Sequence, residues 1–183
     1  MIRVYTIATI VALILCGWLV AAQESDDDTV YVPKLRLGDK APPLRVAEYA
    51  RGSEVDFDKH KGKYIYVIEF WATWCPPCRE SVPHLSELQA KYRDDNVIIV
   101  GVSTEEASDV KTFAEKLGEK MDYVVAIDDD EYTTNHYMGG FGRTSIPHAF
   151  VIGRDGRFAW EGPPMMVEEG IELVLRDDED DDA

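Results

Sequence analysis

The sequence predicts an α/β fold with a central mixed β-sheet flanked by helices. Three observations support this prediction. Short runs rich in β-branched and aromatic residues alternate with amphipathic segments, the last two runs are joined by a Gly-containing turn, and one more amphipathic segment follows. Parallel strands need long crossover connections, which the amphipathic segments supply, whereas a hairpin adds antiparallel strands. We therefore expect strands of both directions in one sheet.

The first part of the domain predicts two buried strands around one helix. Residues 45–57 can hold one or two short edge strands, and residues 63–70 (KYIYVIEF) form the first strong strand. Residues 96–102, rich in Val and Ile, form the second. Between them, residues 77–93 predict a helix with one apolar face. That face carries Val82, Leu85, Leu88 and Tyr92.

The second part predicts further helices, a third strand and the closing hairpin. Ser103 and Glu106 form a capping-box pattern that opens a helix. Asp128 and Glu131 form another helix-start signal, for a short helix that ends near Met138. The remaining segments are a strand over 123–127, strands over 148–152 and 158–161 joined by the turn 153–156, and a final helix containing Val167, Ile171, Val174 and Leu175.

Charge is unevenly distributed along the chain. The 183 residues include 19 Lys and Arg against 35 Asp and Glu, a formal net charge of −16. This balance excludes nucleic-acid binding through a general basic surface, and a hydrophobic fraction of 45% excludes a wholly disordered chain. Acidic runs at 24–28 and 177–182 hold much of the charge. We therefore expect an acidic tether over 23–34, one monomeric domain over 35–176 and a disordered acidic tail over 177–183.

The first 22 residues predict a signal peptide or a membrane anchor. Residues 4–22 carry no charge, Arg3 precedes them, and they end in the small-residue stretch Val20-Ala21-Ala22. This pattern fits a cleaved signal peptide, and an apolar stretch of this length also fits an anchor. Lipid attachment at Cys16 is disfavoured, because bulky residues precede it. In either case the positive-inside bias places the domain outside the cytoplasm.

The cysteines indicate redox chemistry. Cys16 belongs to the export segment, which leaves Cys75 and Cys78 in the mature chain. A disulfide between them closes a very small loop and constrains little of the unfolded chain, so the pair is reactive rather than structural. It lies where a strand meets a helix, and the helix N-terminus stabilises a thiolate at Cys75. We assign Cys75 as the nucleophile and Cys78 as the resolving cysteine, with no cofactor and no metal.

Residues 67–83 (VIEFWATWCPPCRESVP) resemble the active-site segment of TlpA-like thiol–disulfide oxidoreductases, which belong to the redoxin-type branch of the thioredoxin superfamily. The resemblance extends over about residues 36–176. It implies a thioredoxin-like fold with an inserted strand–helix segment. It also implies an exported or membrane-anchored enzyme whose partners are protein disulfides and a thiol-donating redox protein.

The same resemblance suggests a substrate-binding surface. Ser145-Ile146-Pro147 is similar to the loop in which the family places a cis-proline facing the cysteines, and Pro147 would be that residue. The backbone of this loop would pair with an extended substrate peptide. We name Trp74, Pro76, Ile146 and Pro147 as candidate substrate-binding residues.

Glu69 is the third candidate catalytic residue. Strand alternation places Ile65, Val67, Glu69 and Trp71 on one face, where a carboxylate is costly unless it is protonated, paired or useful. The resemblance implies that Glu69 is the general base that deprotonates Cys78. Many family members carry a Glu three residues after the second cysteine, where this chain has Ser81, so more weight falls on Glu69. The alternative is an edge carboxylate that reaches solvent.

Other interpretations rest on weaker patterns. A thiol peroxidase would need Thr or Ser at position 72 and Pro at position 68, where this chain has Ala72 and Ile68. A copper or zinc carrier could use Cys75, Cys78 and His148, although the four histidines show no ligand spacing. His148 follows Pro147, and it either tunes the cysteine pKa values or simply starts a strand.

Overall fold

The computed structural model describes residues 33–57, 59–60 and 62–181. Its six strands are β1 (Val46–Arg51), β2 (Ile65–Phe70), β3 (Val97–Ser103), β4 (Val124–Asp128), β5 (His148–Ile152) and β6 (Phe158–Gly162). Its α-helices are α2 (Pro76–Lys91), α3 (Ala107–Leu117), α4 (Tyr132–Thr134) and α5 (Val167–Asp181). The 3-10 helices η1 (Gly118–Met121) and η3 (Pro164–Met166) and the π-helix η2 (Asn135–Gly139) complete the elements.

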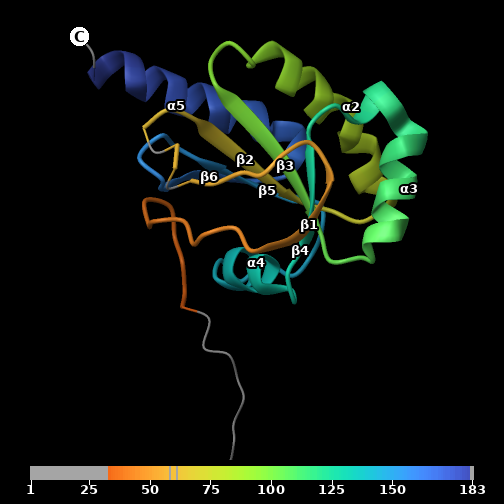
Figure 1. Cartoon of the computed structure of the whole chain (residues 1–183). Coiled ribbons are helices and arrows are strands. Elements are labelled where there is room, and N and C mark those ends of the chain that lie inside the picture. Colours follow the sequence, from red (N-terminus) through yellow and green to blue (C-terminus); the bar gives the residue numbers. More distant parts are fainter. Residues whose placement is uncertain (1–32, 58, 61, 182–183) are drawn as a thin grey trace, which may run out of the picture. The chain divides into compact units, whose positions relative to one another are not determined.

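The strands form one mixed sheet in the order β1-β4-β3-β2-β5-β6 (Figure 1). Strands β2, β3 and β4 are parallel, and they are connected through α2 and α3. The edge strand β1 and the hairpin β5–β6 add antiparallel pairs. The predicted α/β fold with a mixed sheet is confirmed.

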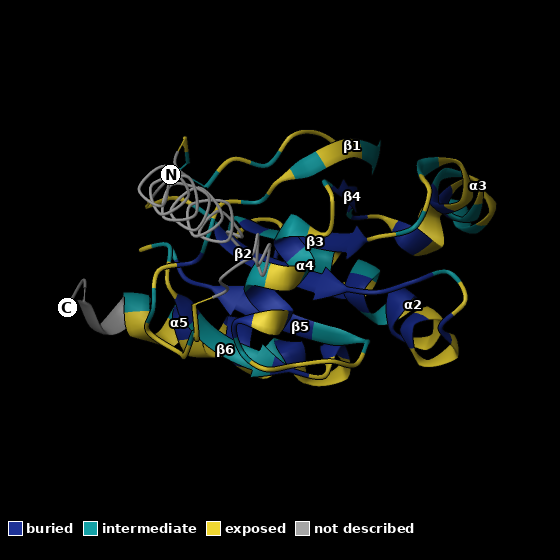
Figure 2. Ribbon diagram, turned by 90° about the horizontal axis from the view of Figure 1, so that it is seen from below, coloured by how far each residue is buried: buried dark blue, intermediate teal, exposed yellow. Residues whose placement is uncertain are grey.

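Each face of the sheet has its own apolar core. Helices α2, α3 and α5 cover one face, where their apolar residues pack on alternate residues of the strands. On the other face, Tyr137 and Met138 of η2 and the chain before β2 pack on the remaining strand residues. All six residues of β2 are buried because this strand lies between β3 and β5. Figure 2 shows the buried strands in the centre and exposed residues on the outer sides of the helices.

The predicted capping box is wrong. Ser103 is the last residue of β3, α3 begins at Ala107, and the side chain of its N-cap residue Glu106 makes no capping hydrogen bond. By contrast, Asp128 does cap the next helical turn, because its carboxylate accepts hydrogen bonds from the backbone N–H groups of Thr133 (2.9 Å) and Thr134 (2.7 Å).

The two ends of the domain are described to different extents. The expected signal or anchor and all but the last residues of the expected tether lie outside the described residues. None of the helices in the described ranges combines the length and the apolar character that crossing a bilayer requires. The tail expected from residue 177 instead continues α5 to Asp181. Arg154, in the β5–β6 turn, holds Asp178 of this helix by an ion pair of 2.6 Å.

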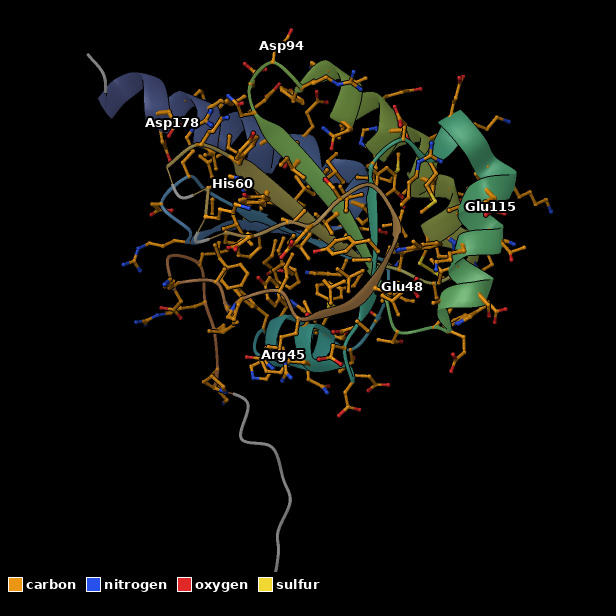
Figure 3. All side chains as sticks on the ribbon, viewed as in Figure 1. Arg45, Glu48, His60, Asp94, Glu115 and Asp178 are labelled. Atoms are coloured by element: carbon orange, nitrogen blue, oxygen red, sulfur yellow. A yellow bond between two sulfur atoms is a disulfide. The ribbon has the colours of Figure 1, made fainter. Side chains whose placement is uncertain are left out.

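The acidic surplus lies mainly on the surface. Figure 3 shows Glu48, Asp94 and Glu115 on three separate parts of the domain, and all three are exposed. Of the acidic side chains whose burial is described, only Glu69 and Asp128 are buried. Because hydrogen bonds satisfy Asp128, Glu69 is the unusual carboxylate of the two.

Candidate active site

The two cysteines lie at the start of α2. Cys75 is the N-cap residue, and Pro76 and Pro77 occupy the first helical positions, where a missing N–H costs nothing. A disulfide joins Cys75 to Cys78, and the Cys75 Sγ accepts a hydrogen bond from the Cys78 backbone N–H at 3.3 Å. Cys75 is 3% exposed and Cys78 is fully buried. The outer cysteine is therefore the one that a partner could reach first.

The predicted contact residues around the disulfide differ in exposure. Trp74 is 69% exposed, and Pro76 is exposed beside it. Trp71 is instead buried against Phe113 of α3, with the two ring centroids 5.5 Å apart. Trp74 is therefore able to contact a partner protein, whereas Trp71 belongs to the core.

The loop with Pro147 lies at the same end of the sheet as the cysteines. The Ile146–Pro147 peptide bond is cis, and both residues are half-buried. Strand β5 begins at His148, opposite Phe70, the last residue of β2. Because β2 leads directly into the cysteine loop, the register places Pro147 beside the start of that loop.

Glu69 lies in the interior, on the face of the sheet that α2 and the cysteines cover. It is 1% exposed, and neither carboxylate oxygen has a hydrogen-bond partner. Burial raises its pKa well above the usual range, because the charged form loses its hydration. The alternative of an edge carboxylate that reaches solvent is therefore wrong. Its strand neighbours Val67 and Trp71 share one core cluster with Cys75 and Cys78, as the strand alternation predicts.

His148 belongs to a charged group next to this loop. Its Nε2 lies 2.6 Å from a carboxylate oxygen of Glu161, which also pairs with Arg143. Burial lowers the pKa of His148, although the hydrogen bond that joins its ring to the Glu161 carboxylate acts in the opposite direction. Burial alone would raise the pKa of Glu161, but the hydrogen bonds from Arg143 and His148 hold it below its usual value. His148 therefore starts a strand, and its influence on the cysteines stays a prediction.

Glu105 is a site residue that sequence reasoning missed. Its carboxylate accepts hydrogen bonds from the backbone N–H and from the hydroxyl of Thr73, both at 2.6 Å. The hydroxyl of Ser103 donates to the same carboxylate at 3.1 Å. Thr73 precedes Trp74 and Cys75, so Glu105 fixes the segment that presents the disulfide. The sequence signal that could have identified Glu105 is a carboxylate just after β3, a strand that runs parallel to β2.

Replacing Glu105 by Ala should loosen this segment. Three hydrogen bonds to a charged group are lost, and each typically contributes about 1.5–3 kcal/mol. Since water replaces part of the loss at this half-buried position, we expect about 2–3 kcal/mol less stability in urea denaturation and slower insulin reduction. Glu106→Ala is the matched control, because the Glu106 side chain makes no capping bond. Equal effects from both variants would contradict the role of Glu105.

Comparisons with known proteins agree with this geometry. The family model described as Redoxin matches residues 36–172. The chain is 32% identical over 144 residues to the thiol-disulfide oxidoreductase ResA of Bacillus thuringiensis (strain Al Hakam), which covers 78% of this chain and 79% of that protein. ResA of Geobacillus kaustophilus is 29% identical over 140 residues, with 76% of each chain covered.

A solved structure extends the agreement to the fold. The crystal structure of a thiol:disulfide interchange protein of the thioredoxin family from Chlorobium tepidum TLS has a TM-score of 0.63 and 26% identity. The match covers 78% of this chain and 99% of that one. The predicted thioredoxin-like fold is confirmed. With a matching family model, relatives above 30% identity and a Cys75–Cys78 disulfide at a helix N-terminus, the chain belongs to the redoxin family and is a thiol–disulfide oxidoreductase.

Proposed function

We propose that the protein reduces disulfides in partner proteins outside the cytoplasm. The observation that carries this proposal is a disulfide at the N-terminus of α2, on the same face of the sheet as the buried carboxyl group of Glu69, which has no hydrogen-bond partner. The location is supported by the sequence pattern of Arg3 followed by the uncharged residues 4–22, which the positive-inside rule would orient with Arg3 towards the cytoplasm. The partner is a protein that carries an accessible disulfide.

The reaction transfers two electrons. In the dithiol form, the Cys75 thiolate attacks one sulfur of the partner disulfide, and the other partner sulfur leaves as a thiolate that takes up a proton. Cys78 then loses its proton and attacks the Cys75 sulfur. The mixed disulfide breaks, the second partner thiol is released, and the Cys75–Cys78 disulfide forms. A dithiol of a second redox protein returns the enzyme to the reduced form.

Glu69 accepts the proton of Cys78 in this proposal. An ordinary carboxylate is a poor base for a thiol with a pKa of about 8.5, because the two pKa values lie far apart. Burial raises the pKa of Glu69 towards that of the thiol, which favours proton transfer near neutral pH. Cys78 is fully buried on the same face of the sheet, where water is a poor competitor for this role.

Trp74, Pro76, Ile146 and Pro147 form the proposed docking surface. Trp74 and Pro76 are exposed next to the disulfide, and the register of β5 brings Pro147 to the same end of the sheet. An extended partner segment lying along residues 145–147 would place its own disulfide over Cys75. The apolar side chains of this surface would add contact area to that backbone pairing.

Trapping tests the assigned order of the two cysteines. Cys78→Ser should form a stable mixed disulfide with an oxidised model peptide, because Cys75 can attack but nothing resolves the product. Intact-protein mass spectrometry should show the added peptide, and peptide mapping should place it on Cys75. Cys75→Ser is the matched control and should stay unmodified, since Cys78 is fully buried. An adduct on Cys78 instead would reverse the assigned roles and overturn this order of steps.

A further inference from the structure

A group of buried polar atoms lies beside Glu69. Within the ranges that the structure describes, seven buried side-chain atoms lack a hydrogen-bond partner. Four of them come from three residues on one face of the sheet: both carboxylate oxygens of Glu69, the indole Nε1 of Trp71 and the hydroxyl of Tyr123. Orphaned buried polar atoms are costly and rare, so their gathering on one face needs an explanation.

Gly101 brings these groups together. It pairs with Glu69 in the parallel register of β2 and β3, so position 101 lies next to the carboxyl group on the same face. A Cβ atom at Gly101 would lie 2.9 Å from the Nε1 of Trp71 and 3.1 Å from the Cε2 of Tyr123. The absence of a side chain at Gly101 therefore lets both rings close over the position beside Glu69.

Tyr123 also interacts electrostatically with Glu69. Burial, and then the negative charge of Glu69, raise the pKa of Tyr123 well above its usual value. The hydroxyl therefore keeps its proton and is available as a donor. Tyr123 leads into β4, whose Val125 and Ile127 pack in the same core cluster.

The other residues that cover this face cannot take the place of Tyr123. Among the described residues of the apolar cluster on this face, the polar-ended side chains besides Trp71 and Tyr123 are Cys75 and Cys78, which form the disulfide, and Tyr92 at the end of α2. The Tyr92 hydroxyl bonds to Glu168 and Glu172 instead. The residues that α3, α5, β3 and β5 contribute to the apolar cluster offer no hydrogen-bond donor from their side chains: Val110, Ala114, Val167, Ile171, Val174, Val97, Ile99, Ala149 and Val151. Two buried hydroxyls of α2 and β3 are bonded elsewhere, because Ser81 donates to the backbone carbonyl of Cys78 (2.8 Å) and Ser103 donates to Glu105 (3.1 Å).

We propose that Tyr123 is a positioning residue for Glu69, whose hydroxyl donates a hydrogen bond to the carboxylate when Glu69 takes up its negative charge. The Nε1 of Trp71 supplies a second donor. In the disulfide form the carboxyl group is neutral and makes neither bond. Once it is ionised, a small side-chain rotation brings the carboxylate to both donors. This inference rests on the proposed function of Glu69 as the group that exchanges a proton with Cys78.

Tyr123→Phe tests the proposal, because it removes the hydroxyl and keeps the ring. We expect the pKa of Glu69 in the full-length oxidised protein to rise by about one to two pH units, the equivalent of one hydrogen bond to a charged group. The pKa is read from the carboxyl C=O infrared band of protein labelled with ¹³C-Glu, and the band is assigned by its loss in Glu69→Gln. Thermal unfolding checks that the variant is folded.

Tyr66→Phe is the matched control. Its hydroxyl is also buried without a partner in β2, but it belongs to the core on the opposite face. We expect no shift of the Glu69 band in this variant. An unshifted band in Tyr123→Phe, or an equal shift in both variants, would overturn the inference.

A kinetic measurement separates this inference from the proposed function. The pH profile for release of the mixed disulfide should shift upward in Tyr123→Phe by the same amount as the infrared band. Suppose that the Glu69 band shifts in Tyr123→Phe but Glu69→Gln releases the mixed disulfide at the wild-type rate. The role of Glu69 as base is then wrong, while the contact between Tyr123 and Glu69 stands. If Glu69→Gln releases the mixed disulfide slowly and the Glu69 band does not shift in Tyr123→Phe, the positioning role of Tyr123 is wrong and the proposed function stands.

Discussion

Replacing Cys75 by serine is expected to reduce the insulin-reduction rate with dithiothreitol to the rate measured without enzyme. The thiolate is the nucleophile in disulfide exchange, and a serine hydroxyl is not ionised near neutral pH. Cys75 is also the N-cap residue of α2, where unpaired backbone N–H groups stabilise a thiolate. No other residue near the helix start can replace that sulfur, since Cys78 is fully buried.

The matched control for this loss is Cys16→Ser, the same substitution at the third cysteine. We expect its rate to equal that of the wild-type protein. Both variants are compared after full reduction, so that loss of the disulfide cross-link does not confuse the measurement. Residual turnover in Cys75→Ser would mean that Cys78 or another group can start the exchange, and it would contradict the mechanism.

Glu69→Gln is expected to remove most of the pH dependence of stability above pH 5. Because burial raises the pKa of Glu69 above its usual value of 4.5, the folded state binds this proton more tightly than the unfolded state does. The resulting stabilisation is fully present below pH 4.5. It falls as the pH rises towards the folded pKa, by up to about 1.4 kcal/mol per pH unit.

Urea denaturation of the oxidised protein at several values between pH 5 and pH 8 measures this effect. Glutamine has nearly the same shape and no charge. The free energy of unfolding of Glu69→Gln should therefore vary less with pH, and at pH 8 it should exceed that of wild type. Exposed Glu80 offers the control variant Glu80→Gln, which should follow the wild-type curve. Parallel curves for wild type and Glu69→Gln would show that Glu69 titrates normally in the folded protein.

The same variant should also be slow in one step of the reaction. General acid–base catalysis typically contributes about 100- to 10,000-fold, so release of the mixed disulfide by Cys78 should slow within that range. Formation of the mixed disulfide at Cys75 should be nearly unchanged. Stopped-flow measurement of the two phases separates them, and equal slowing of both would argue for a general structural defect.

Much of the site could be predicted because it is local in the sequence. Cys75 and Cys78 lie at the junction of a strand and a helix, and both elements are marked by periodicity over six or more residues. Glu69 lies six residues before Cys75 in the strand that leads to the cysteines, and the two-residue repeat places it on one face with Val67 and Trp71. The repeat did not decide between a buried carboxyl group and an edge carboxylate that reaches solvent. The similarity of Ser145-Ile146-Pro147 to a loop of TlpA-like proteins then pointed to Pro147 as the cis-proline of that loop, and the Ile146–Pro147 peptide bond is cis in the structure.

The predictions that failed depended on contacts between distant residues. Ser103 and Glu106 fit a capping box, but Ser103 ends β3 and the neighbouring Glu105 bonds instead to Thr73, 32 residues earlier. The acidic residues after 176 fit a disordered tail, yet Asp178 pairs with Arg154 from the β5–β6 turn and α5 continues to Asp181. In both cases a contact with a residue distant in the sequence outweighed a weak local preference.

The sequence by itself therefore determined the fold class, the reactive pair and the face of the strand that carries Glu69, because each follows from a short-range repeat or spacing. Only the tertiary structure decided what surrounds Glu69. Parallel pairing of β2 with β3 brings Gly101 beside it, and Tyr123, the residue before β4, comes from more than 50 positions away. Strand order and register create such neighbours, and the periodicity of a single strand carries no information about the strand that will lie next to it.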